Sequence, residues 1–160
     1  GAGNDTVYLI KNGWSVISID KENVEERISK RLNKEELIRF NFQKQELETI
    51  KLEMSDLIIA NYSLSFCNKQ EFNKMWKTIE ENIVQEGYFV GNFFGINDSW
   101  NKAESNMTFF IKNQVMDLFK KFEIIKFDEI EKDALTGLGK MKHWHIFNVM
   151  ARKNSRKSTI

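Results

Sequence analysis

A glycine-rich turn and one aspartate near the amino-terminal end of the chain are placed to bind a nucleotide-like cofactor. The turn contains Gly1 and Gly3, and Asp20 ends the alternating, β-branched segment 14–19. In open α/β sheets, ligands bind beyond the carboxyl ends of the strands, where a glycine turn lets them approach the backbone. A carboxylate at the end of the next strand accepts hydrogen bonds from a ribose diol. We therefore interpret Asp20 as a ribose ligand, with capping of the following helix as the alternative.

Two histidines near the other end of the chain offer a second kind of chemistry. His143 and His145 stand two positions apart in a segment with strand character, so their side chains share one face. Such a pair is suited to proton transfer or to metal binding. Neither a carboxylate nor a cysteine is arranged with them in an obvious ligand pattern, and we expect no metal. The alternative is a pair of hydrogen-bonded structural histidines.

Strands and helices have to position these residues, and the hydrophobic pattern predicts both in alternation. Short alternating or apolar runs predict strands, and apolar residues at helical spacing predict helices. The predicted strands cover 14–19, 37–43, 56–60, 88–94, 123–127 and 143–151, and the predicted helices cover 7–11, 23–32, 69–84 and 112–121. This alternation favours βαβ units and a mostly parallel sheet.

Two strands have special positions in this scheme. The continuous apolar run 56–60 is typical of a strand that is buried on both faces, which predicts a central position. The last two strands have no helix between them, only a segment rich in glycine and charge. We expect them to form a long antiparallel hairpin, because a parallel crossover normally uses a helix.

Composition indicates an ordinary globular protein with balanced charge. The 160 residues are 41% hydrophobic and 29% charged, and 24 basic residues face 23 acidic ones. This length suits one domain, and the net charge of +1 creates no global field toward nucleic acid or anionic membranes. Arg152, Lys153, Arg156 and Lys157 form a local basic excess, which we interpret as a solvated terminus rather than a docking segment.

Other compositional signals point to the cytoplasm. Cys67 is the only cysteine, so the chain cannot form an internal disulfide. No apolar stretch approaches the roughly 18 residues of a membrane span, and no secretory signal is visible. We therefore expect a cytoplasmic protein without membrane or nucleic-acid partners.

Three segments, in this order, resemble the cofactor-binding motifs of class I S-adenosylmethionine-dependent methyltransferases. They are 1–5, 16–20 and 56–61. The terminal strands, through 142–147, resemble the antiparallel hairpin that separates this family from ordinary nucleotide-binding Rossmann folds. Within the family, the chain is most similar to small bacterial methyltransferases of the tellurite-resistance type. The residues that carry this closer likeness are 92–100, 106–109 and 142–145.

The resemblance implies a fold and a cofactor. The fold is a Rossmann-like three-layer α/β sandwich with a mostly parallel twisted sheet and an antiparallel carboxyl-terminal strand. The cofactor is S-adenosylmethionine, whose methionine part would lie in the turn of Gly1 and Gly3 and whose ribose hydroxyls would bind Asp20.

The remaining cofactor contacts implied by the resemblance follow two later strands. Glu46 would bind the adenine amino group and Leu47 would lie against the ring, with a solvated loop acid as the alternative for Glu46. Asn61, Tyr62 and Ser63 follow the strand 56–60, where the sulfonium end is expected.

One feature departs from the family. The family's glycine turn follows a strand that ends in an acidic residue and another glycine, whereas nothing precedes Gly1 in this sequence. We therefore expect an amino-terminally truncated methyltransferase domain over 1–153, with its first strand missing, and a basic tail over 154–160. Because that strand normally lies in the middle of the sheet, its two neighbours would lack a hydrogen-bonded partner.

The expected reaction is methyl transfer to a small-molecule acceptor. An in-line displacement at a sulfonium depends mainly on holding the reacting atoms close and aligned. A general base is needed only if the acceptor is protonated at the working pH. The candidate catalytic residues are His143, His145 and Asp98.

Three aromatic residues in the same segments have two possible roles. Tyr62, Phe94 and Trp100 either wall the acceptor pocket, where they could also contact the sulfonium charge, or pack in the core.

Two other functions stay open at this point. A nicotinamide-dependent oxidoreductase would use the same glycine turn and acid, although the last glycine of the dinucleotide fingerprint is absent after Gly3. A non-catalytic fragment of a methyltransferase is the second, because of the missing strand.

Overall fold

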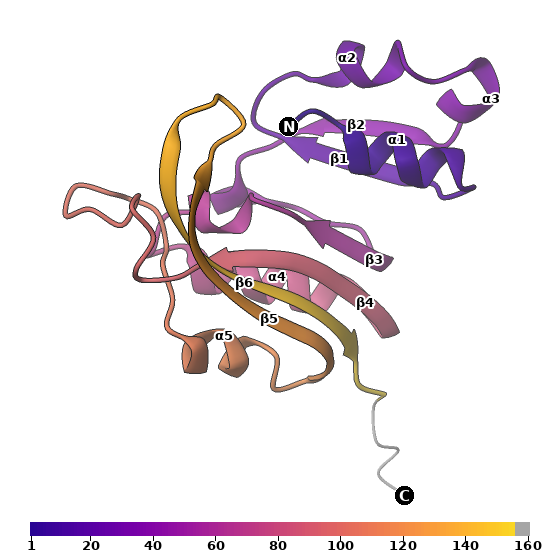
Figure 1. The fold of residues 1–160 in the computed structure, drawn as a ribbon. Coiled ribbons are helices and arrows are strands. Elements are labelled where there is room, and N and C mark those ends of the chain that lie inside the picture. Colours follow the sequence, from indigo (N-terminus) through magenta and orange to yellow (C-terminus); the bar gives the residue numbers. More distant parts are fainter. Residues whose placement is uncertain (156–160) are drawn as a thin grey trace, which may run out of the picture. The chain divides into compact units, whose positions relative to one another are not determined.

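The computed structural model describes residues 1–155 and divides the chain into two compact units. The first unit is Gly1–Ile50 and the second begins at Lys51. Each unit has its own sheet, of two strands in the first and four in the second (Figure 1). Arg156 and Lys157 of the predicted basic tail lie outside the described residues.

The first unit is a βαβ arrangement preceded by a helix. Its elements are α1 (Asn4–Lys11), β1 (Val16–Asp20), α2 (Glu25–Ser29), α3 (Lys34–Leu37), β2 (Phe40–Lys44) and the 3-10 helix η1 (Leu47–Thr49). The strands β1 and β2 are parallel, and Asp20 is paired with Lys44 at their carboxyl ends. The apolar side chains between helices and strands form one small core, which contains Val7, Val24, Ile28, Leu32, Phe40 and Phe42. This core packs α1 and α2 against β2.

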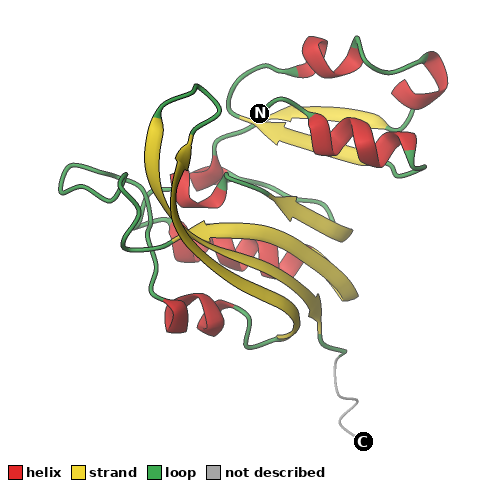
Figure 2. Ribbon diagram, viewed as in Figure 1, coloured by secondary structure: helices red, strands yellow, loops and turns green. Residues whose placement is uncertain are grey.

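The second unit is a mixed sheet covered by helices (Figure 2). Its elements are β3 (Ser55–Ala60), the 3-10 helix η2 (Leu64–Phe66), α4 (Phe72–Asn82), β4 (Ile83–Phe94), α5 (Lys112–Leu118), β5 (Phe122–Leu135) and β6 (Met141–Lys153). The strand order is β3-β4-β6-β5. β3 and β4 are parallel, and β6 is antiparallel to both β4 and β5. The predicted antiparallel hairpin at the end of the chain is therefore confirmed.

Aromatic side chains dominate the core of the second unit. Trp76 of α4 packs edge-on against Phe89 of β4 and against Phe119 at the end of α5, with ring centroids 5.2 and 5.1 Å apart. The indole N–H of Trp76 donates to the Leu118 carbonyl at 3.2 Å. This one side chain therefore joins both helices to the same face of the sheet, as the helical spacing in 69–84 predicts.

Several predicted boundaries were wrong, and local chemistry explains two of them. The strand expected over 37–43 begins only at Phe40, because Asn33 and Glu36 form a reciprocal capping box that starts α3, with bonds of 2.9 and 2.8 Å. Ile38, expected on a strand face, is 85% exposed. The glycine- and charge-rich segment is mostly strand, because its charged residues pair across β5 and β6.

The prediction that 56–60 is a central strand was also wrong. In the four-stranded sheet β3 lies at an edge, and Ala60 is its only fully buried residue. An apolar run indicates burial in general, and it does not tell a central strand from an edge strand.

No helix in the described part of the chain is both long enough and apolar enough to cross a bilayer.

Candidate functional site

The glycine turn of the first unit has a backbone conformation that requires glycine. Gly3 precedes α1 with a φ of 73°, in the left-handed region. A Cβ on Gly3 would lie 2.4 Å from a side-chain carbon of Ile28, so the turn also packs closely on α2. The turn thus leads directly into the amino-terminal end of α1, where the first backbone N–H groups of a helix have no carbonyl partner inside the helix itself.

Asp20 ends β1, the strand that packs beside α1, where the Thr6 and Ser18 hydroxyls are 2.7 Å apart. Its Oδ1 accepts a hydrogen bond from the Glu22 N–H at 2.9 Å. The side chain keeps an exposure of 20%. The bond to Glu22 shows that Asp20 organises the loop that follows β1, and its contact with a ribose stays a prediction.

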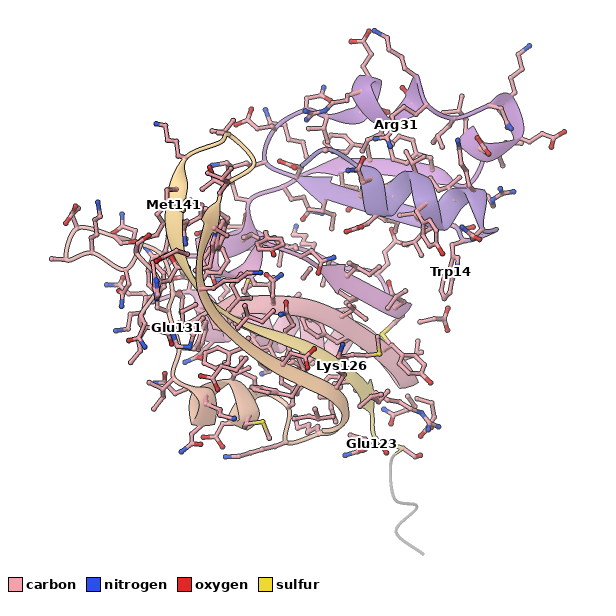
Figure 3. All side chains as sticks on the ribbon, in the orientation of Figure 1. Trp14, Arg31, Glu123, Lys126, Glu131 and Met141 are labelled. Atoms are coloured by element: carbon pink, nitrogen blue, oxygen red, sulfur yellow. The ribbon has the colours of Figure 1, made fainter. Side chains whose placement is uncertain are left out.

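Sequence reasoning missed Arg31, which fixes the turn from α2's side. Its guanidinium donates to the Ala2 carbonyl at 2.9 Å and to the Asn4 side-chain oxygen at 3.1 Å. Arg31 is labelled in Figure 3. The sequence gives little indication of this role, since an arginine after a short helix is ordinarily solvated. Its bonds span the turn on both sides of Gly3.

Glu46 and Leu47 follow the carboxyl end of β2, which is paired with the carboxyl end of β1, where Asp20 lies. The Gln45 N–H donates to the Asp20 carbonyl at 3.1 Å, so the segment after β2 follows the end of β1 directly. Glu46 is exposed and Leu47 is half-buried. This placement is consistent with their predicted adenine contacts, which stay a prediction.

The other predicted cofactor residues lie in the second unit, after β3. Tyr62 has a φ of 49°, rare for a residue with a side chain, and its N–H donates to the side-chain oxygen of Asn92 at 2.8 Å. Asn92 lies on β4 and is buried. Asn61 and Ser63 flank Tyr62 in this loop. The buried amide of Asn92, which sequence reasoning missed, holds the strained turn in place.

A buried ion pair organises the loop between β4 and α5. The ammonium of Lys142 contacts Oδ1 of Asp98, and both side chains are almost fully buried, at 2% and 0% exposure. Asp98 also accepts hydrogen bonds from the Trp100 N–H at 3.0 Å and the His145 N–H at 3.3 Å. These contacts favour a positioning role for Asp98, whose role as a general base stays a prediction. Burial lowers the pKa of Lys142, and the bond and charge of Asp98 offset part of that effect.

His145 is buried with both ring nitrogens engaged. Its Nδ1 accepts from the Asn97 N–H at 3.2 Å, which leaves the proton on Nε2, 3.2 Å from a Glu129 carboxylate oxygen. The ring also lies against Gly95, whose added Cβ would be 2.1 Å from Nδ1. Such a histidine is held by structure, and its predicted catalytic role would require one of these bonds to break.

His143 is half-exposed and lies between two carboxylates of β5. Its Nδ1 is 2.8 Å from Asp133, and its Nε2 is 3.2 Å from Glu131, which is labelled in Figure 3. Hydrogen bonds to Asp133 and Glu131 raise the pKa of His143 above its ordinary value. Hydrogen bonds from Asn97 and His143 lower the pKa of Glu131. The acids favour the imidazolium, which is a poor general base.

We predict that His143 makes the stability of the protein depend on pH. Because its pKa is raised by folding, its stabilising contribution is complete below the unfolded value of about 6.5 and is lost as pH rises through the folded value. His143→Gln should therefore reduce the fall in melting temperature between mildly acidic and mildly alkaline pH. Thermal melts of both proteins across this range measure the difference. Equal slopes for the two proteins would contradict the prediction.

The described residues contain no group of three or more histidine, cysteine, aspartate or glutamate side chains with the geometry of a metal site. The acids around His143 and His145 are within hydrogen-bond distance of the two imidazole rings.

Comparison with families and curated proteins gives no match. No family model and no curated protein matches the chain.

Solved structures do match, over nearly the whole chain. TehB from Haemophilus influenzae is 18% identical with a TM-score of 0.78, over 96% of this chain and 55% of that one. A 1,6-didemethyltoxoflavin-N1-methyltransferase from Burkholderia thailandensis is 17% identical with a TM-score of 0.69, over 97% and 68%. The N-methyltransferase NodS from Bradyrhizobium japonicum WM9 is 10% identical with a TM-score of 0.69, over 97% and 82%.

The chain has the class I methyltransferase fold. The similarity to TehB confirms the predicted likeness to the tellurite-resistance type at the level of the fold. The chain spans about half the length of TehB. At these identities the methyltransferase fold is established, whereas activity has to be argued from the site.

Proposed function

We propose that the chain binds S-adenosylmethionine and transfers its methyl group to a small-molecule acceptor. The observation that carries this proposal is a left-handed glycine turn that leads into α1, beside a strand that ends in Asp20, within a methyltransferase fold. The Thr6 hydroxyl of α1 lies 2.7 Å from the Ser18 hydroxyl of β1, two residues before Asp20. The turn offers a close backbone approach, and the carboxylate of Asp20 is the acceptor that a ribose diol requires. The cofactor supplies the electrophilic methyl group, and the chain's residues bind and orient the two substrates.

Two neighbours support the choice of cofactor and acceptor class. The didemethyltoxoflavin methyltransferase contains S-adenosylhomocysteine together with its small-molecule substrate, and a second NodS structure contains S-adenosylhomocysteine. Both neighbours are N-methyltransferases, and the first acts on a small molecule. A cytoplasmic location stays a prediction from the single cysteine and from the lack of a visible signal or span in the sequence. The absence of nucleic-acid and membrane partners stays a prediction from the balanced charge.

The proposal is tested by calorimetric titration with S-adenosylhomocysteine and, separately, with NAD. We expect heat with the first and none with the second. The reverse result would establish the oxidoreductase alternative. If S-adenosylhomocysteine does not bind at millimolar concentration, the proposal fails and the chain is a non-catalytic fragment of a methyltransferase.

Asp20→Asn is the matching variant. It keeps the shape of the side chain and removes the charge, so S-adenosylhomocysteine should bind roughly 10–100-fold more weakly, because a hydrogen bond to a charged group contributes about 1.5–3 kcal/mol. Glu22→Gln is the control, since Glu22 meets Asp20 only through its backbone N–H. If both variants bind like the unchanged protein, Asp20 is not the ribose ligand.

A further inference from the structure

Five aromatic rings gather at one end of the sheet in the second unit. Phe94, at the end of β4, is 1% exposed and lies 5.7–6.3 Å from the ring centroids of its four neighbours. Those neighbours are Tyr62, Phe66, Trp100 and Trp144. Three of them are large apolar side chains with much of their surface in solvent: Tyr62 at 53%, Phe66 at 49% and Trp100 at 36%. We call these three residues the aromatic wall.

The wall is held from behind by polar contacts. The ammonium of Lys142 lies 3.9 Å from the Trp144 ring centroid, 4.3 Å from that of Trp100 and 5.4 Å from that of Phe94. The pairing of Lys142 with buried Asp98, which also accepts the Trp100 N–H, fixes the start of the loop that carries Trp100. The Ser65 hydroxyl accepts the Phe94 N–H at 2.8 Å and so ties the Phe66 segment to β4. The exposed rings are therefore preorganised before any ligand arrives.

Exposed aromatic side chains stabilise a fold less than buried ones. When several lie together on the surface, they mark a binding site. A protein partner is a poor fit, because a stable interface uses about 20–30 residues on each side and the wall offers three. A cationic ligand is also a poor fit, because the ammonium of Lys142 already lies over the rings of Trp100 and Trp144. A flat, uncharged ring needs only a small contact area and is not repelled by the Lys142 ammonium, so it can stack on the exposed faces of the wall's rings.

We propose that the aromatic wall of Tyr62, Phe66 and Trp100 is the acceptor site and that it takes a planar, uncharged aromatic or heteroaromatic acceptor. The inference rests on the proposed methyl transfer, since Tyr62 stands in the segment 61–63, where the sulfonium end is expected. A lone pair on a ring nitrogen or on a ring-bound oxygen forms the new bond to the methyl carbon. The sulfur keeps the electron pair of the broken bond and becomes a neutral thioether, and the acceptor's proton leaves to water.

Lys142 is then a positioning residue of this site. It reaches the ligand only through the rings it fixes, so its role is to keep Trp100 and Trp144 in one arrangement.

The test compares three probes of similar size, each titrated in the presence of S-adenosylhomocysteine. They are 2-naphthol, which is planar and neutral, decahydro-2-naphthol, which is neutral and not planar, and N-methylquinolinium, which is planar and cationic. We expect 2-naphthol to bind at least about tenfold more tightly than either of the others. Equal binding of the saturated alcohol, tighter binding of the cation, or no binding of 2-naphthol at millimolar concentration would each overturn the proposal.

Variants locate the binding. Trp100→Ala and the milder Phe66→Leu should weaken 2-naphthol binding, the first by about tenfold. Tyr88→Ala is the control, because Tyr88 is also an exposed aromatic residue, at 41%, and lies six residues before Phe94 on β4. It should leave 2-naphthol binding unchanged. An effect of Tyr88→Ala equal to that of Trp100→Ala would overturn the assignment to the wall.

The two proposals fail separately in this design. If S-adenosylhomocysteine binds and 2-naphthol does not, the acceptor site is wrong and the proposed function stands. If 2-naphthol binds at the wall with and without S-adenosylhomocysteine, and S-adenosylhomocysteine itself gives no heat, the proposed function fails instead.

Discussion

Replacing Lys142 by methionine is expected to lower the free energy of unfolding of the second unit by about 3–5 kcal/mol. The substitution keeps an unbranched side chain among the rings of Trp100 and Trp144 but leaves the Asp98 carboxylate buried without its cation. Removing one partner of a buried pair lowers stability, because the remaining charge is buried away from water without an opposite charge beside it. Urea unfolding followed by tryptophan fluorescence measures the change, since Trp76, Trp100 and Trp144 all lie in this unit.

The double variant Lys142→Met with Asp98→Asn is the control for this explanation. It removes both charges, and the single amide oxygen of asparagine can still accept from one of the Trp100 and His145 N–H groups, which bond to different oxygens of Asp98. We expect it to recover much of the lost stability, because a buried pair replaced as a whole is often neutral. A double variant no more stable than Lys142→Met would show that packing around Lys142, rather than the charge of Asp98, is responsible.

Gly95→Ala is expected to destabilise the second unit by about 1–3 kcal/mol or more, although it adds a single methyl group. The new Cβ would lie 2.1–2.4 Å from three atoms of the His145 ring, so the ring has to move. That movement also breaks the bond from the Asn97 N–H to Nδ1, and the backbone bond from the Gly95 N–H to the His145 carbonyl, at 2.7 Å, leaves little freedom to adjust. Urea unfolding gives the stability, and the His145 ring resonances report the displacement.

Gly137→Ala is the matched control in the same unit. No heavy atom lies within 4 Å of the Cβ that it would add, so its stability should differ little from that of the unchanged protein. Equal losses for the two alanine variants would mean that backbone freedom, and not the close approach of His145, sets the cost at Gly95.

Much of the fold could be predicted from local patterns. The helical spacing of Phe72, Met75, Trp76 and Ile79 correctly predicts the buried face of α4. The lack of a helical pattern between the last two predicted strands correctly predicts the β5–β6 hairpin. The edge position of β3 could not be predicted, because it depends on which strands hydrogen-bond, and hydrophobicity along one strand does not report its neighbours.

The candidate site was predictable only where it lies close in sequence or repeats a known motif. Gly3 and Asp20 mark the turn and the strand end by residue type, and both positions are as predicted in the first unit: Gly3 precedes α1 and Asp20 ends β1. Lys142 and Asp98 are 44 residues apart, and each is an ordinary charged residue by sequence. Their pairing follows from the antiparallel position of β6 beside β4, which brings the start of β6 to the loop after Phe94.

The place of β6 in the sheet also sets the order in which this chain can fold during synthesis. β4 and β5 are not paired with each other, since β6 lies between them and bonds to both (Figure 1). A nascent chain that has emerged only as far as β5 therefore exposes a strand of 14 residues with no place to dock in the growing sheet. Until Met141–Lys153 has left the ribosome, that strand is open to pairing with other chains, so a chaperone that shields β5 would raise the yield of folded protein.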